Sequence, residues 1–328
     1  MSPASADTPA PRYRVGVDLG GTKIECIVLR DDVLARHRRP TPADAGQPPA
    51  ERYRAILDAI NELVRETLTQ VEGAPTLDSA NLSLGIGIPG ILNPATGLVI
   101  NANTTCLIDR ALGADLQRLL GRPVAIENDA NCFVAAEAHS GAGASTGASG
   151  TPEGREIVFG VIMGTGCGGG IYIKDSGGGL VRSGRHGFAG EGGHISIDPG
   201  GRECWCGNRG CVETMISGSG VEAGHCERTG RALSMHAIVS GFRSGDAECS
   251  ETMQQFFQDF GRALGGLISM LDPDLVVLGG GLSNIPALYP QGMDELRRFA
   301  FHPGLETPVL KNELGDSAGV FGAAWIGV

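Results

Sequence analysis

The apolar and polar positions of this chain alternate between short apolar runs and helical repeats, which predicts a protein of mixed strands and helices. Near the start, "RVGVDLGGTKIECIVLR" (residues 14–30) holds two apolar runs separated by a glycine pair, so we predict a strand, a glycine turn and a second strand. Residues 50–71 repeat apolar side chains at helical spacing. The apolar face of that helix is expected to carry Ile56, Ile60, Leu63 and Val64. "LSLGIGIPGILNP" (residues 82–94) then predicts a buried strand that ends in a turn.

The same alternation continues through the second half of the chain. "VAIENDANCFVAAEAHSGAG" (residues 124–143) predicts a strand followed by a helix that begins near Asn128 or Asp129. Residues 156–175 repeat the strand, glycine turn and strand of the start, after a low-complexity segment (140–154) that we expect to be a mobile surface loop. Further helices are expected at about 213–224, 234–243, 250–271 and 317–328, with a strand at 274–281 that leads into a helix. The pattern therefore predicts two similar strand-rich halves.

Composition narrows this α/β prediction without changing it. The 328 residues suffice for two domains, and 52 glycines with only 5% aromatic residues suit a protein of many tight strand-to-helix turns. A net charge of −11 argues against binding to nucleic acid or to an anionic membrane. The sequence shows no secretory signal and no long apolar span, and its odd number of cysteines (nine) suits free thiols or metal ligands. We therefore expect a cytoplasmic protein.

Three glycine turns follow apolar strands and could hold phosphate groups. In "DLGGTK" (Asp18–Lys23), Gly20 and Gly21 permit positive φ and a close backbone approach, and Asp18 could hold a hydrated Mg²⁺. An ordinary hairpin turn explains that pair equally well. The others are "IMGTGCGGG" (162–170) and "VVLGGGLSN" (276–284), and neither fits the P-loop or the dinucleotide-binding pattern. Three such turns together favour a nucleoside triphosphate held between two domains.

"ENDAN" carries two polar side chains where a strand meets a helix. At the carboxyl edge of an α/β sheet, Asp129 could accept a proton from a substrate hydroxyl while Asn128 holds a neighbouring hydroxyl. The alternative is a helix cap, which is the more common role of these residue types at this position.

A cluster of soft ligands lies in "HISIDPGGRECWCGNRGCVE". Its members suit a closed tetrahedral zinc site, and they are His194, Cys204, Cys206 and Cys211. Gly207 and Gly210 allow the short cysteine loop to turn back, although the C-x-C-x4-C spacing leaves reactive or buried thiols as the alternative. Glu191 and Glu213 flank the cluster, so a structural metal would fix two carboxylates able to bind sugar hydroxyls.

The ordered motifs "VGVDLGGTKIECIVL", "GIGIPG", "ENDANC", "IMGTGCGGG", "GEGGH" and "CWCGNRGCVE" resemble the ROK family of bacterial sugar kinases and related repressors, within the actin-like ATPase superfamily. The resemblance runs from about residue 14 to the end. Within the family, "NANTT", "GTGCGGG" and "LGDSAGVFGAAW" look most similar to bacterial fructokinases (mannofructokinases), with N-acetylglucosamine kinases next.

The resemblance implies an ATP-dependent hexose kinase that phosphorylates the 6-position of fructose or mannose, with Mg²⁺ accompanying ATP and Asp129 as general base. N-acetylglucosamine kinase and glucokinase are the alternatives, and a non-catalytic sugar-binding regulator is a remote one. A family repressor would carry a helix-turn-helix before the first glycine turn, where only about fifteen Pro/Ala-rich residues stand. The implied sugar contacts are Asn103, Asn128, Glu191, His194 and Glu213. The implied ATP contacts are Asp18, Gly20, Gly21, Thr22, Lys23, Gly164, Thr165, Gly166, Gly279, Gly280 and Gly281.

The resemblance also implies two RNase H-like domains with a cleft between them. The smaller would span 12–127 plus 315–328, and the larger 128–314 with the zinc-binding insertion, commonly in a homodimer. Two positions depart from the family pattern. Gly192 in "EGGH" replaces a larger apolar residue, and Cys106 stands where relatives often carry tryptophan. Both departures are expected to affect sugar preference more than catalysis.

Overall fold

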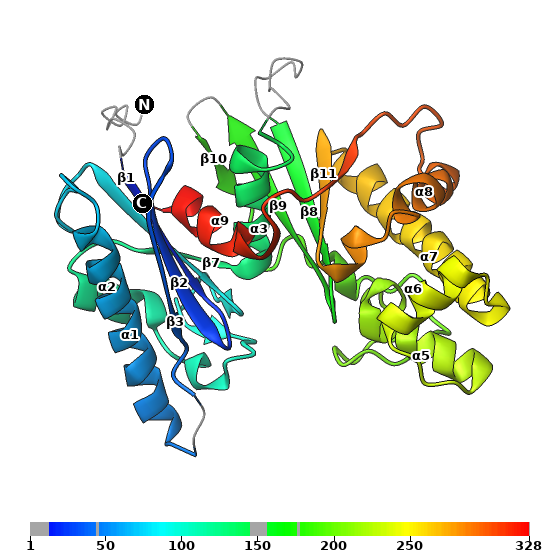
Figure 1. Cartoon of the computed structure of the whole chain (residues 1–328), viewed down its shortest axis with the longest axis horizontal. Coiled ribbons are helices and arrows are strands. Elements are labelled where there is room, and N and C mark those ends of the chain that lie inside the picture. The colour runs from blue at the N-terminus through cyan, green and yellow to red at the C-terminus, as the bar shows by residue number, and fades with distance from the viewer. Residues whose placement is uncertain (1–12, 44–45, 145–155, 176–177, 328) are drawn as a thin grey trace.

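The computed structural model describes residues 13–43, 46–144, 156–175 and 178–327, and its framework is two five-stranded mixed sheets (Figure 1). The first sheet has the order β3-β2-β1-β4-β7. Its first three strands are antiparallel neighbours, whereas β1, β4 and β7 run parallel. The strands are β1 (Tyr13–Leu19), β2 (Lys23–Leu29), β3 (Val33–Pro40), β4 (Leu82–Ile88) and β7 (Ala125–Asn128).

The second sheet repeats this plan as β10-β9-β8-β11-β12, with the same mixture of antiparallel and parallel pairs. Its strands are β8 (Glu156–Met163), β9 (Cys167–Asp175), β10 (Gly178–Val181), β11 (Leu275–Gly279) and β12 (Val309–Lys311). A separate two-stranded ribbon joins β5 (Ile91–Leu92) to β6 (Val99–Ile100). The expected repetition of the strand, turn and strand unit is thus confirmed, and so is the α/β class.

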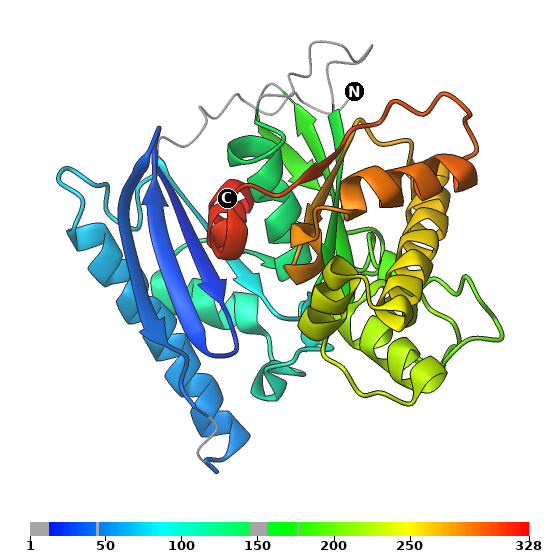
Figure 2. The same ribbon diagram turned by 45° about the vertical axis from the view of Figure 1, so that its right-hand side comes forward.

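Helices cover the outer faces of the two sheets. In the first half, α1 (Pro49–Thr69) and α2 (Leu112–Leu120) bury their apolar side chains in one core with β1, β2 and β4. Ile56, Ile60 and Leu63 of α1 are fully buried there, as the helical spacing predicts. In the second half, the long α7 shares a core with the second sheet, and the other helices gather around it (Figure 2). They are α4 (Glu213–Ile216), α5 (Gly218–Thr229), α6 (Met235–Ser244), α7 (Ala247–Leu271) and α8 (Met293–Phe299).

Two helices join the halves by crossing between them. The first half ends in β7, but α3 (Asp129–Ser140) continues from it and packs on β8 and β9 of the second sheet. The second half ends in β12, and α9 (Ala318–Ile326) returns to pack on β1 and β4 of the first sheet. Figure 1 shows α3 and α9 against each other between the sheets.

Glycines in the first sheet let α9 approach closely. Gly16 of β1 and Gly85 of β4 are register partners, and a Cβ at either position would lie within 2.2 Å of a backbone oxygen of α9. No side chain larger than hydrogen fits between the helix and the sheet at these two points. The sheet therefore offers a flat glycine surface that fixes the C-terminal helix.

Several predicted helices differ in their ends. The helix expected at 213–224 is broken, because Ser217 caps a new helix by accepting from the Gly220 N–H at 3.0 Å. The helix expected from 250 begins at Ala247, since Asp246 caps it. After β11 the chain enters a 3-10 turn, Gly281–Asn284, instead of an α-helix, and Gly280 before it has a φ of 78°. Most of the segment 140–154 lies outside the described residues. Within the part of the chain that the structure describes, no helix combines the length and apolar character needed to cross a membrane.

Candidate active site

The junction of β7 and α3 presents Asp129 at the first position of a helix. Its Oδ1 accepts from the Ala130 N–H at 2.8 Å, and the Asn128 side chain caps the same N–H at 2.9 Å. Asn128 also donates from Nδ2 to the Gly90 oxygen at 3.1 Å. Asn128 is thus the helix cap, the alternative considered for it, and any contact with a sugar stays a prediction.

The environment of Asp129 favours its neutral form. The side chain remains accessible to water, but it lies inside a cleft where surrounding protein reduces its hydration, and this desolvation raises its pKa above 3.8. The hydrogen bonds from Ala130 and Asn128 oppose the shift without cancelling it. A carboxylate of raised pKa is a stronger proton acceptor than an ordinary aspartate once it is ionised.

A cavity of about 560 Å³ runs from Asp129 between the two sheets. It brings together Asp18, Gly20 and Gly21 from the first half with Gly280 and Gly281 from the second. A Cβ at Gly21 or Gly281 would meet open space, so backbone at these turns is bare toward the cavity. Gly20 and Gly21 could adopt positive φ because they are glycines, but they do not. Gly280 does.

Other predicted phosphate contacts lie around this cavity instead of lining it. Lys23 extends toward the buried Glu25, with Nζ at 3.8 Å from Oε2, and the backbone oxygen of Thr22 accepts from Thr41 at 3.0 Å. The second glycine turn, Gly164–Thr165–Gly166, is anchored by α5, since its Gly164 oxygen accepts from the Gly218 N–H at 2.7 Å. Gly279 packs against the Phe133 ring.

The cavity also has walls that the sequence analysis did not single out. Asn284 and the segment Lys311–Asn312–Glu313 line it from the second half, and Gly319 of α9 closes it behind Asp18. Glu313 and Leu314 are held in place because their N–H groups donate to the buried Glu137 of α3 at 3.1 and 3.0 Å. The signal that identifies Lys311–Glu313 is their place at the carboxyl end of a parallel strand, where α/β sheets bind ligands.

Asp18 contributes a carboxyl group to the wall of the cavity. Burial, then the nearby carboxylates of Asp129 and Glu25, raise the pKa of Asp18 to about 6, while Lys23 opposes them. A divalent cation beside Asp18 would relieve this repulsion, and a carboxylate oxygen is a ligand that Mg²⁺ accepts. The donor set therefore fits a magnesium ion that accompanies phosphate groups.

Glu191 and Glu213 contribute two further carboxylates from the second half of the chain. Burial raises the pKa of Glu191, and the negative charges of Asp129 and Glu213 add to the shift while His194 opposes it. Glu213 contacts the second glycine turn, since its Oε2 accepts from the Cys167 N–H at 2.9 Å. Asn103 is exposed and donates its backbone N–H to Pro89, which lines the cavity. Glu191 is thus within electrostatic reach of Asp129, and Asn103 is bonded to a residue of the cavity wall.

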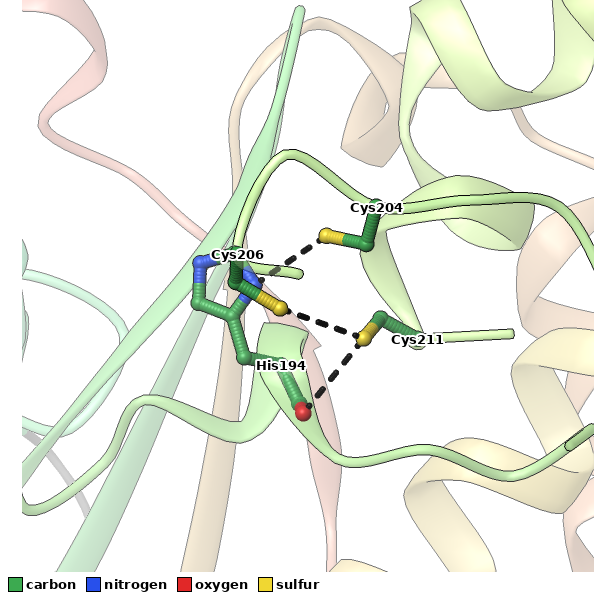
Figure 3. Close-up of side chains that lie close together, drawn as sticks. All are labelled: His194, Cys204, Cys206 and Cys211. Carbon is green, nitrogen blue, oxygen red and sulfur yellow. Dashed lines mark hydrogen bonds between the residues drawn. The ribbon is translucent and has the colours of Figure 1, made fainter. Parts of the chain in front are cut away.

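The four predicted metal ligands converge on one point (Figure 3). One ring nitrogen of His194 and the sulfur atoms of Cys204, Cys206 and Cys211 all lie within 4.8 Å of one another. The Cys206 and Cys211 sulfurs are 3.6 Å apart, and His194 Nδ1 is 3.6 Å from the Cys204 sulfur. A tetrahedral zinc with Zn–S bonds of about 2.3 Å requires sulfur–sulfur edges of about 3.8 Å, so these residues fit the ion. Gly207 and Gly210 have φ of 91° and 61°, as the tight loop needs.

Comparison with known proteins supports the family and changes the expected substrate. The chain is 35% identical over 325 residues to an N-acetyl-D-glucosamine kinase of Pasteurella multocida, covering 95% of this chain and 98% of that protein. It is 36% identical over 326 residues to an N-acetyl-D-glucosamine kinase of Yersinia pseudotuberculosis, with 95% and 97% covered. These relatives do not support the expected similarity to fructokinases.

Solved structures share the whole architecture. A ROK hexokinase from Thermus thermophilus matches with a TM-score of 0.79 at 29% identity, covering 96% of this chain and 97% of that chain. A ROK family glucokinase from Streptomyces griseus, in complex with glucose and AMPPNP, matches with a TM-score of 0.66 at 27% identity, covering 96% and 99%. The two repeated sheets are therefore those of the actin-like ATPase fold. The sequence model of the ROK family matches residues 14–327, and the chain belongs to that family.

Proposed function

We propose that this chain is an ATP-dependent sugar kinase that phosphorylates N-acetylglucosamine, at the 6-hydroxyl that the family resemblance implies. The observation that carries the sugar is the identity of 35–36% to N-acetyl-D-glucosamine kinases over 95% of the chain. The observation that supports kinase chemistry is the cavity in which Asp129 meets the first and third glycine turns and Asp18.

In this proposal ATP occupies the 560 Å³ cavity with its phosphates toward Asp129. The bare backbone at Gly21 and Gly281 lets the phosphates approach closely. Mg²⁺ held near Asp18 would neutralise charge on the β- and γ-phosphates. The protein's main task is then alignment, because phosphoryl transfer passes through a loose transition state.

Asp129 acts as the general base. Its Oδ1 is engaged by the Ala130 N–H, which leaves Oδ2 to accept the proton of the sugar hydroxyl. As that proton leaves, the hydroxyl oxygen forms a bond to the γ-phosphorus and the bond from the γ-phosphorus to the bridging oxygen of ADP breaks. The products are sugar phosphate and ADP, and the proton remains on Asp129 until solvent removes it.

The sugar is proposed to lie against Glu191, His194 and Glu213, with Asn103 and Asn128 on the side of the first half. Zinc would hold His194 and the loop between the carboxylates. We retain the proposed domain limits, 12–127 with 315–328 and 128–314. Close to these boundaries, α3 begins to pack on the second sheet and α9 returns to pack on the first. The homodimer implied by the resemblance and the cytoplasmic location expected from the sequence remain part of the proposal.

The test is an ADP-release assay with Mg-ATP and zinc-loaded protein against N-acetylglucosamine, glucose, N-acetylmannosamine, mannose and fructose. We expect the highest kcat/KM with N-acetylglucosamine. Glucose is the second candidate, because the Streptomyces griseus structure is a glucokinase with glucose bound. A preference for fructose would overturn the sugar assignment, and no turnover with any of the five would overturn the kinase assignment.

A further inference from the structure

Trp205 lies between two proposed zinc ligands in the sequence, and it is hydrogen-bonded to a carboxylate of the proposed sugar site. Its neighbours in the chain are Cys204 and Cys206, in a tight loop closed by the Gly207 N–H donating to the Cys204 oxygen at 3.0 Å. The indole Nε1–H donates to Glu213 Oε1 at 2.7 Å. The zinc loop therefore reaches Glu213 directly, through a side chain that is not a metal ligand.

This contact completes the orientation of Glu213. Its other oxygen, Oε2, accepts from the Cys167 N–H at 2.9 Å. A Cβ at Gly166 would lie 2.7 Å from Oε2, so the carboxylate rests against the second glycine turn. With one donor on each oxygen the carboxylate plane is fixed, and each oxygen keeps a lone pair for another hydrogen bond.

The Trp205 ring is largely exposed to solvent even though it contacts His194. It is 68% exposed, although its edge meets His194 at a centroid distance of 4.7 Å and an interplanar angle of 88°. Large aromatic side chains next to convergent polar groups are typical of ligand sites, where the ring covers an apolar part of the ligand. The ring thus lies beside two residues proposed to bind sugar and leaves most of its surface free.

We propose that Trp205 is a positioning residue of the sugar site. The zinc loop fixes the position of Trp205, whose indole N–H orients the Glu213 carboxylate, and the exposed face of its ring forms an apolar wall for the sugar. This inference rests on the proposed function, because it assumes that Glu213 binds a sugar hydroxyl. It adds a residue that acts through Glu213, and it explains how a metal without an open coordination position acts on substrate binding.

The kinetic test compares Trp205→Phe with Trp205→Ala. Phenylalanine keeps an aromatic wall but lacks the N–H, so KM for N-acetylglucosamine should rise about 10-fold, the effect of losing one hydrogen bond to a charged acceptor. KM for ATP should stay unchanged, and zinc content should remain at one ion per chain in both variants. Alanine also removes the wall and should raise the sugar KM further. The matched control is Phe301→Ala, which removes an aromatic side chain that is 89% exposed elsewhere.

A spectroscopic test reads the same site without turnover. The chain has two tryptophans and four tyrosines, and Trp325→Phe leaves Trp205 as the single tryptophan, whose emission can be excited selectively. Titration of this zinc-loaded variant with N-acetylglucosamine, in the absence of ATP, should change its emission saturably, whereas glycerol should not. Because binding is measured without phosphoryl transfer, the result does not depend on kinase activity.

The outcomes separate this inference from the proposed function. If sugars are phosphorylated but Trp205→Phe and Trp205→Ala keep the wild-type sugar KM, the role of Trp205 is overturned and the kinase stands. A normal KM in Trp205→Phe with a raised KM in Trp205→Ala would overturn the positioning of Glu213. If no sugar is phosphorylated and none changes the emission, the proposed function itself fails.

Discussion

Gly322 of α9 lies directly against the carbonyl oxygen of Cys132 in α3, where a Cβ at position 322 would come within 1.6 Å of that oxygen. These helices each pack on the sheet of the other half, so this close contact lies where the halves of the molecule are joined. Neither backbone can move away without shifting a helix against its sheet. A glycine at this point is therefore a requirement of the connection between the halves.

Gly322→Ala is expected to lower the free energy of unfolding by about 3 kcal/mol, because the added methyl group overpacks two backbones. Gly266→Ala is the matched control, since Gly266 lies in the exposed face of α7 and a Cβ there would meet nothing within 4 Å. Alanine at this position should stabilise the protein by about 0.5–1 kcal/mol through helix propensity. Chemical denaturation followed by circular dichroism measures both changes. Equal effects of the two variants would show that the contact between α3 and α9 is not tight.

Asp129→Asn is expected to lower kcat by about 10²- to 10⁴-fold while leaving zinc content and the sugar KM intact, because asparagine cannot accept the proton. Desolvation inside the cleft raises the pKa of Asp129 although its side chain stays accessible to water, so ionisation above pH 3.8 lowers the free energy of unfolding only modestly. The variant should therefore be at least as stable as the wild type at pH 7. The matched control is Asp31→Asn, an exposed aspartate in the turn between β2 and β3.

The pH profile of kcat/KM gives a second test of Asp129. A base must be ionised to act, so activity should fall as pH decreases through a pKa above the ordinary value of 3.8. A profile that stays flat down to pH 4 would contradict the assignment, and so would near-wild-type turnover in Asp129→Asn.

Removal of the zinc should weaken sugar binding more than ATP binding. In Cys206→Ser one of the four ligands is lost, and the loop that connects His194 to Glu213 loses its cross-link. We expect zinc content below one ion per chain, a lower melting temperature and a raised KM for sugar. Cys226→Ser is the control, because Cys226 is a free thiol outside the cluster. Unchanged KM for sugar in a metal-free protein would break the proposed link between the metal and the sugar site.

The convergence of the four proposed metal ligands and the glycine turns could be predicted because their signals are local. His194, Cys204, Cys206 and Cys211 lie in one short stretch, and their residue types alone suggest tetrahedral zinc. Each glycine turn likewise follows its own apolar strand. The break at Ser217 also has a local signal, because the capping serine of "ISGSG" is followed directly by Gly218, although the prediction of one helix over 213–224 missed it.

The remainder of the site depends on contacts between distant segments. Lys311 and Glu313 reach the cavity because α3 holds their segment through Glu137, a relationship of residues more than 170 positions apart. The bond from Trp205 to Glu213 depends on the path of the metal loop, which spacing does not specify. The nearest functional relatives were the least predictable feature, because the motifs suggested fructokinases whereas the whole chain matches N-acetyl-D-glucosamine kinases.

Glu25 is a buried carboxylate that binds three cations of the first sheet. Arg36 and Arg38 pair with it from β3, the latter at 2.9 Å, and Lys23 Nζ lies 3.8 Å away. Arg36 also donates to Ser317, just before α9, at 2.6 Å. Glu25→Ala should lower the free energy of unfolding by about 2 kcal/mol, because partly exposed cations lose their common partner.

Glu203→Ala is the control for Glu25. Glu203 pairs with Arg209 at 2.7 Å, but its side chain is 82% exposed, and such surface pairs contribute about 0–1 kcal/mol. Urea titration at low and high salt distinguishes the two sites, since salt screens the exposed pair more effectively. A loss at Glu25 no greater than at Glu203 would show that the buried carboxylate does not organise the first sheet.

Gly192 and Gly193 are neighbours just before His194 of the proposed zinc site, yet they should respond oppositely to alanine. A Cβ at Gly193 would lie 2.1 Å from the backbone oxygen of Cys167 in β9, which cannot move without disturbing the sheet. A Cβ at Gly192 would meet only the side-chain end of Leu267, at 3.1 Å, and this leucine can rotate. Gly192 does not have positive φ, so its backbone conformation is open to other residues.

Gly193→Ala is therefore expected to destabilise the protein by about 1–3 kcal/mol through overpacking. Gly192→Ala should be neutral or stabilise it by up to about 1 kcal/mol, because alanine restricts the unfolded chain. We expect the smaller residue at 192 to affect sugar preference, as its departure from the family pattern suggests, so its variant should change the ratio of kcat/KM for N-acetylglucosamine and glucose. Melting temperatures and the two kcat/KM values measure both effects. Equal destabilisation by the two alanines would show that Gly192 is required by packing, as Gly193 is.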